Sequence, residues 1–200
     1  AKLLYFQSTL ALPEKYYLLH QADWLAIQLG ATPGMTDYNN ALKSGFDVIA
    51  NHWPSWLKSI MPLSVLPTVV APGTLIGKLS AAVMLELGIK QSEAPLIKAG
   101  TTDSLAAFIA TGANRVGEGV TSLGSTLVLK LICKNPVFDA ETGLYSHKLG
   151  NRWLCGGASN TGGAVLRDFF TDKQLMTLSQ KIDLKQSPPN YYPLLKPGER

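Results

Sequence analysis

The spacing of hydrophobic residues in the first half of the chain predicts two helices. Residues 12–30, LPEKYYLLHQADWLAIQLG, carry apolar side chains three and four positions apart, which is typical of one helical face. We expect Pro13 in the first turn of this helix and Gly30 at its end. Residues 80–89 repeat the spacing between a serine and a glycine, the residue types that suit the two ends of a helix.

Shorter helices are expected between these two. Residues 35–47, MTDYNNALKSGFD, predict a turn and a short helix with Thr36 or Asp37 as its N-cap. Gly45 is placed to follow the end of that helix. Residues 52–61, HWPSWLKSIM, predict another short helix.

Strands are predicted where short apolar runs are bounded by proline or glycine. Residues 66–79 contain two such runs, broken by Ala-Pro-Gly, and residues 94–100 contain a third, which we expect to be a buried strand. A helix rich in small residues follows at 103–113. Because strands and helices alternate in this order, the sequence predicts an α/β layer architecture.

The second half of the chain has a different pattern. Residues 117–135 and 143–157 each read as two strands around a polar turn, and so predict two hairpins. Helices are expected at 159–170 and at 171–182, the second with Thr171 as its cap. The change of pattern predicts a domain boundary near residues 116–119.

Composition narrows the function classes. The 200 residues are 46% hydrophobic and 16% charged, which suits one large or two small globular domains. The net charge of +4 comes from scattered basic residues, so we expect no nucleic-acid partner, although small anionic ligands would be favoured. No apolar run is as long as the roughly 18 residues of a membrane span, and no signal peptide is recognised. Cytoplasmic location is expected, or plastid stroma in a plant.

Several chemically reactive residues are expected to be structural. Cys133 and Cys155 lie in apolar runs without metal-ligand spacing, which favours buried free thiols in a reducing compartment. A surface or packing pair is expected at His20 and Asp23, and His147 is expected to be structural or exposed. The two tryptophans of the 52–61 helix are expected to pack in the core or at its rim. The sequence contains no G-x-S-x-G motif, so a serine hydrolase is not expected.

Three features carry candidate chemistry. Asp103 follows an apolar strand and a Gly-Thr-Thr turn, where it is either an N-cap, a first-turn acid or a functional carboxylate. The run Gly124-Ser125-Thr126 is a small, hydroxyl-rich turn whose amides can approach a phosphate. Gly162 and Gly163 open a helix, and a helix N-terminus favours anions.

These features, in this order, resemble the FGGY family of carbohydrate kinases. The similarity extends over nearly the whole chain and is densest between Ala99 and Lys130. The matching segments are HQADWLAIQLG, TDYNNAL, AGTTDSLAAFIATGA, TSLGSTLVLKL and GGASNTGGAVLRDFF. YSHKLG, CGGASN and YYPL…GER look closest to the ribulose or xylulose kinase-like members of cyanobacteria and plants.

The resemblance implies a role for each feature. Asp103 matches the family's catalytic base, which lies in a cleft between two lobes and takes the proton of the sugar hydroxyl that attacks the γ-phosphate of ATP. Thr101 and Thr102 would shape the turn, and Thr102 would also bind substrate. Gly124, Ser125 and Thr126 would face the β- and γ-phosphates, with Gly162 and Gly163 near the phosphates or ribose. ATP and Mg²⁺, the latter near Asp103, are the implied cofactors.

The resemblance also implies an α/β, actin-like ATPase (ribonuclease H-like) fold with two lobes, both incomplete in this chain. Residues 1–116 would end the sugar-binding lobe, and residues 117–200 would begin the nucleotide-binding lobe. The family's first phosphate turn, of Asp-x-Gly-Thr type, and its glycine-rich adenine motif have no counterpart here, as expected for the middle section of a longer enzyme. The expected partner is a small sugar, a ketose or polyol. The alternatives are a non-catalytic nucleotide- or partner-binding relative and an inactive fragment; oligomeric state is left open.

Overall fold

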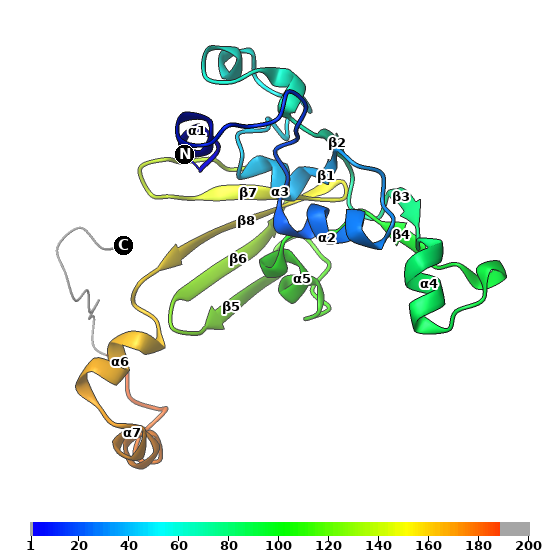
Figure 1. Ribbon diagram of the computed structural model, residues 1–200. Helices are drawn as coiled ribbons and strands as arrows, with labels where there is room; N and C mark the ends of the chain where they lie inside the picture. The colour runs from blue at the N-terminus through cyan, green and yellow to red at the C-terminus, as the bar shows by residue number, and fades with distance from the viewer. Residues whose placement is uncertain (1, 189–200) are drawn as a thin grey trace. The chain divides into compact units, whose positions relative to one another are not determined.

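A computed structural model describes residues 2–188 of the chain (Figure 1). These residues divide into two units, and the division lies between Ala106 and Ala107. The division lies N-terminal to the boundary expected at residues 116–119, and the assignment of the two parts to sugar and nucleotide lobes stays a prediction. The similarity in YYPL…GER lies outside the described residues.

The first unit contains short helices and two small sheets. Strands β1 (Met35–Asp37) and β2 (Thr68–Val70) pair in parallel, and β3 (Leu75–Lys78) and β4 (Leu96–Lys98) pair antiparallel. The helices are α1 (Lys2–Thr9), α2 (Gln21–Leu29), α3 (Tyr38–Leu42), α4 (Ala81–Leu87) and the start of α5 (Asp103–Ile109). Short 3₁₀ helices lie at Ser55–Ser59, Leu63–Val65 and Gln91–Glu93.

Local signals placed several helix ends correctly. Gly30 and Gly88 end α2 and α4 with φ of 119° and 68°, values that glycine adopts readily. The side chain of Ser80 caps α4. Asp37 is the N-cap of α3, and its side chain accepts from the amides of the second and third residues of that helix.

The start of α2 was wrong in the sequence prediction. Residues 12–20 are not helical, and the helix begins at Gln21 rather than near Pro13. Two contacts explain the late start. The Leu18 amide donates to the Val65 carbonyl at 2.7 Å, and the Asp23 carboxylate accepts the amide of His20, which is in an extended conformation.

The segment at 52–61 is also less helical than predicted. It contains only the 3₁₀ turn Ser55–Ser59. Trp53 packs as expected, edge-on against Phe46 with ring centroids 5.1 Å apart, and its Nε1 donates to the Pro67 carbonyl. Trp56 is 56% exposed, so the packing role expected for it is wrong.

Strand β4 is half-buried rather than buried. Ile97 packs on a small core of Ala31, Ile76 and Ala99, whereas Leu96, next to it, is 52% exposed. Successive side chains of a strand point to opposite faces, and the small two-stranded sheet has its core cluster against one of them.

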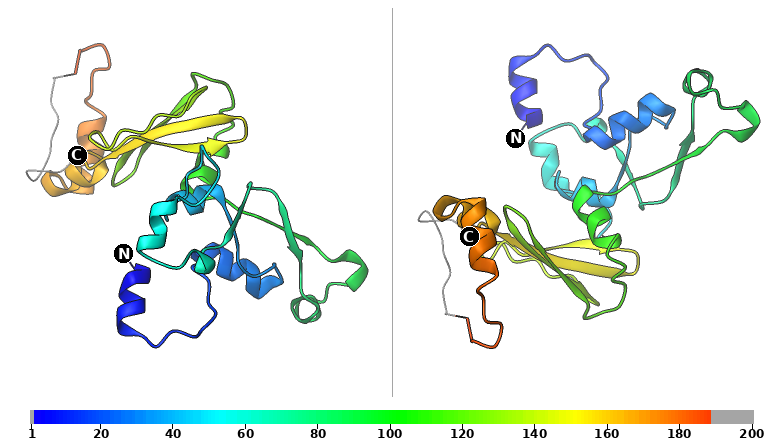
Figure 2. Two further views of the ribbon diagram at one scale, coloured as in Figure 1. Left: turned by 90° about the horizontal axis from the view of Figure 1, so that it is seen from above. Right: turned by 90° about the horizontal axis from the view of Figure 1, so that it is seen from below.

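The second unit is built on one antiparallel sheet that contains the two predicted hairpins. Its strands are β5 (Gly119–Leu123), β6 (Leu127–Cys133), β7 (Tyr145–Leu149) and β8 (Arg152–Ser159), in the order β5-β6-β8-β7 (Figure 1). Helix α6 (Gly163–Phe169) follows from the end of β8, and α7 (Asp172–Ser179) comes next (Figure 2). Ile132, Leu154 and His147 are buried on one face of the sheet. Both cysteines are free but half-buried, because they lie on neighbouring strands of a partly exposed sheet, rather than buried as expected.

A carboxylate closes the turn before β5. Glu118 Oε2 accepts the amides of Asn114 and Arg115 at 2.8 and 3.0 Å, and Oε1 accepts Arg115 Nε at 2.8 Å. These bonds, the one to the Arg115 amide first, lower the pKa of Glu118 from 4.5 to about 2.

This turn should therefore make stability depend on pH. A lowered pKa in the folded state means that the stabilisation is complete above 4.5 and is lost as pH falls towards about 2. We expect Glu118→Gln to reduce the free energy of unfolding above pH 4.5, and this deficit to shrink at lower pH. Denaturant titrations on either side of that pH measure it, with Glu141→Gln as a control. A deficit that does not change with pH would contradict the expectation.

Candidate active site

Asp103 is the first residue of α5, which makes it a first-turn acid and not the N-cap. Its side chain is exposed, and Oδ1 accepts the Ser104 amide at 2.8 Å. Within residues 2–188, no hydrogen bond is formed by Oδ2. The bond to Ser104 fixes the carboxylate while leaving one oxygen open to a ligand.

Thr102, at the N-terminal end of α5, is buried with its hydroxyl unused. It is 3% exposed, and Oγ1 has no hydrogen-bond partner among the described residues. Helix α7 begins with the same dipeptide, Thr171-Asp172, but there the threonine Oγ1 accepts the Gln174 amide in a capping box. A buried hydroxyl without a partner costs about 1–3 kcal/mol, so the start of α5 is not optimised as a helix cap.

A buried side chain holds the turn that precedes Asp103. Asn39, the second residue of α3, is fully buried, and its Nδ2 donates to Thr101 Oγ1 at 3.1 Å. Sequence reasoning did not single out Asn39. The signal available was an asparagine directly after a predicted N-cap, which does not by itself indicate a contact 62 residues away.

The turn Gly124–Thr126 joins β5 to β6, as predicted. The Gly124 amide donates to the Thr126 carbonyl at 3.2 Å. Ser125 and Thr126 are exposed, and in the described part of the chain neither their amides nor their hydroxyls donate a hydrogen bond. Four donors of this turn are thus available to an anion.

Gly162 and Gly163 pack directly against this turn. The Gly163 amide donates to the Gly124 carbonyl at 2.7 Å, and the Ala164 amide donates to the Ser125 carbonyl at 3.2 Å. A Cβ on Gly162 would collide with the Ser125 carbonyl oxygen and lie 2.6 Å from the Thr126 carbonyl carbon. The first amides of α6 are therefore committed to the hairpin, and the two glycines allow this close backbone approach.

The structure thus brings together one part of the predicted site. In the second unit, the carbonyls of Gly124 and Ser125 accept the amides of Gly163 and Ala164, and Gly162 packs against the same turn. Thr102 and Asp103 belong to the first unit.

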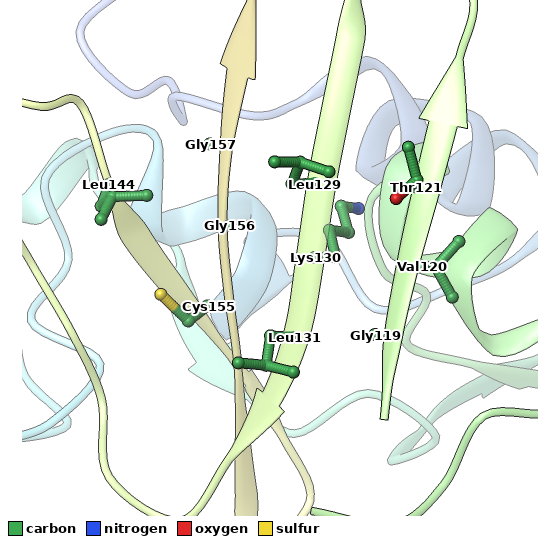
Figure 3. A pocket seen from close by; sticks show the side chains of 10 residues that line it. All are labelled: Gly119, Val120, Thr121, Leu129, Lys130, Leu131, Leu144, Cys155, Gly156 and Gly157. Carbon is green, nitrogen blue, oxygen red and sulfur yellow. The ribbon is translucent and has the colours of Figure 1, made fainter. Parts of the chain in front are cut away.

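A hollow of about 520 Å³ lies on the sheet of the second unit (Figure 3). Side chains of β5, β6 and β8 line it, with glycines among them and with Leu144 from the segment before β7. Its walls are mainly apolar, and it does not include the Gly124–Thr126 turn. Sequence reasoning missed this hollow, because alternation along a strand does not show which face is covered. The lining residues are Gly119, Val120, Thr121, Leu129, Lys130, Leu131, Leu144, Cys155, Gly156 and Gly157.

A Ser–His–Asp sequence of contacts lies in the first unit. His20 Nε2 is 3.1 Å from Ser44 Oγ, and Nδ1 is 3.3 Å from Asp23 Oδ2. The same Asp23 oxygen accepts the His20 amide at 3.0 Å, which is the acidic half of a helix capping box. These contacts tie the start of α2 to the segment after α3, so the packing role predicted for His20 and Asp23 is confirmed, in a part-buried setting.

Among residues 2–188, no group of three or more His, Cys, Asp or Glu side chains could hold a metal ion. Magnesium does not need such a group, since it binds one or two carboxylates together with waters and phosphates. A single exposed carboxylate such as Asp103 fits that mode.

None of the helices in the described part of the chain is long and apolar enough to cross a bilayer.

Solved sugar kinases have the same fold as this chain. A xylulose kinase from Brucella ovis matches with a TM-score of 0.76 and 20% sequence identity. The match covers 90% of this chain and 38% of the kinase. A xylulose kinase from Rhodospirillum rubrum matches with a TM-score of 0.74 and 18% identity, over 92% of this chain and 40% of the kinase. Plasmodium falciparum glycerol kinase with ADP matches with a TM-score of 0.65 and 19% identity, over 83% of this chain and 35% of the kinase. No protein-family model matches the sequence.

These likenesses define the fold class. The chain has a mixed α/β, actin-like ATPase fold, which it shares with these sugar kinases. It spans about two fifths of the length of the kinases that it matches.

Proposed function

We propose that this protein is an ATP-dependent sugar kinase that transfers the γ-phosphate of ATP to a hydroxyl of a ketopentose such as D-ribulose or D-xylulose. The observation that carries the proposal is Asp103. It presents a carboxylate with one open oxygen, directly after the buried Thr102, in a chain with the fold of sugar kinases. The resemblance to ribulose and xylulose kinases supports the choice of sugar.

Asp103 is the general base in this proposal. Its Oδ2 would accept the proton of the attacking sugar hydroxyl, while the bond from the Ser104 amide to Oδ1 holds the carboxylate in place. The buried Thr102 hydroxyl, which has no partner in residues 2–188, would gain one from the bound sugar.

The Gly124–Thr126 turn would hold the β- and γ-phosphates. The exposed amides and hydroxyls of Ser125 and Thr126 are the donors suited to this, and Gly124 leaves space beside them. Gly162 and Gly163 would act mainly by supporting the turn, because the Gly163 amide already donates to the Gly124 carbonyl. Mg²⁺, held near Asp103, would neutralise the charge that develops during transfer.

We expect the complete protein to release ADP from ATP faster when the right sugar is added. A coupled assay against a panel of ketopentoses, hexuloses, glycerol and polyols measures this, and omission of Mg²⁺ should abolish the signal. The largest kcat/KM is expected for a ketopentose. ATP binding without sugar-dependent turnover would favour the alternative, a non-catalytic nucleotide-binding relative. A soluble cytoplasmic or plastid location follows from the same proposal.

A further inference from the structure

Asn39 is a fully buried polar side chain that forms a long-range hydrogen bond. Removing a side-chain amide from water costs free energy unless it forms hydrogen bonds inside the protein. Its Nδ2 donates to Thr101 Oγ1 at 3.1 Å, across 62 residues of sequence. This bond connects α3 to the turn that ends at Asp103.

The Asn39 end of this contact is held firmly. Asp37 is 2% exposed, and its Oδ1 accepts the amides of Asn39 and Asn40 at 2.8 and 3.1 Å. Its Oδ2 accepts Asn40 Nδ2 at 2.6 Å. Because β1 pairs with β2 as far as Asp37, this cap is continuous with a sheet. Asn39 therefore projects from a rigid support.

The turn at the other end has few supports of its own. The backbone of Ala99 is tied to Thr74 and Gly73 at 2.8 and 2.7 Å. Further along the turn, the Thr102 carbonyl accepts two amides of α5 at 3.0 Å. Between these anchors, the Thr101 side chain is held by Asn39.

We propose that Asn39 is a positioning residue that, through Thr101, sets the place of the Asp103 carboxylate. The inference rests on the proposed role of Asp103 as the base. A carboxylate displaced by about 1 Å can cost on the order of 100-fold in rate, since a general base must lie within hydrogen-bond reach of its proton. Loss of the Asn39 contact should therefore lower kcat by about 10- to 100-fold. ATP affinity should not change, because the proposed phosphate donors belong to the second unit.

The test uses matched variants of the complete protein. Thr101→Val removes the acceptor oxygen and keeps the shape of the side chain, and Thr101→Ser restores the hydroxyl. Asn39→Ala removes the donor of the same hydrogen bond. We expect kcat to fall in Thr101→Val and Asn39→Ala and to recover in Thr101→Ser. The KM for ATP should be unchanged in all three variants.

Hydrogen exchange separates this inference from the proposed function. Amides of residues 101–104 should exchange faster in Thr101→Val than in Thr101→Ser, whatever the turnover. Unchanged exchange, or unchanged kcat in Thr101→Val while Asp103→Asn is inactive, would overturn the positioning role and leave the base in place. A fully active Asp103→Asn would instead overturn the proposed function. If Asn39→Ala does not fold, the two Thr101 variants decide.

Discussion

Asp103→Asn is expected to lower sugar-dependent ATP turnover by about 100- to 10,000-fold, the usual cost of removing a general base. Asparagine keeps an oxygen that can accept the Ser104 amide, so the side chain can stay where Asp103 lies. It cannot take a proton from the sugar. We therefore expect ATP affinity, measured by calorimetry, and the melting temperature to remain close to those of the parent, while the coupled assay loses its signal.

Asp172→Asn is the control for this change. Asp172 also follows a threonine and is also the first residue of a helix, α7, so the substitution has the same effect on charge and helix dipole. We expect it to leave turnover unchanged. If both variants kept near-normal turnover, Asp103 would be only a first-turn acid that stabilises α5.

The comparison of these two helix starts shows what sequence can and cannot reveal. Both contain Thr-Asp, and local rules predict a cap for each. In α7 the prediction of Thr171 as the cap is confirmed. In α5 the threonine hydroxyl is buried without a partner in the described residues, which depends on how other segments pack around it. The local pattern therefore predicted that Asp103 lies at the start of a helix, but it could not predict the buried environment of Thr102.

The fold, too, has features that local sequence predicts and features that depend on long-range contacts. Helix ends at Gly30 and Gly88, and the hairpins of the second unit, were predictable because turn residues and strand alternation act over a few positions. The start of α2 was not, since a long-range bond from Leu18 to Val65 holds the preceding segment out of the helix. Likewise, Asn39 meets Thr101 only because α3 and the turn come together in the tertiary structure.

The second large expected effect concerns the Gly124–Thr126 turn and is tested through two glycines, Gly162 and Gly124. Gly162→Ala should destabilise the protein by about 1–3 kcal/mol, because the new Cβ would be forced against the backbone of Ser125 and Thr126. Gly124→Ala should leave stability unchanged, since the atom nearest to its Cβ is the Thr126 carbonyl oxygen at 3.7 Å. Denaturant unfolding of the complete protein measures both.

ATP binding should respond differently to the same two changes. In Gly124→Ala, the added methyl group would occupy the space beside the Ser125 and Thr126 donors, and we expect ATP affinity to fall about tenfold, the loss of one charge-assisted hydrogen bond. In Gly162→Ala, affinity should fall only as far as the turn is displaced. A Gly124→Ala variant with parental ATP affinity in calorimetry would remove the turn from the nucleotide site, whereas a stable Gly162→Ala variant would show that α6 does not depend on its close contact with the hairpin.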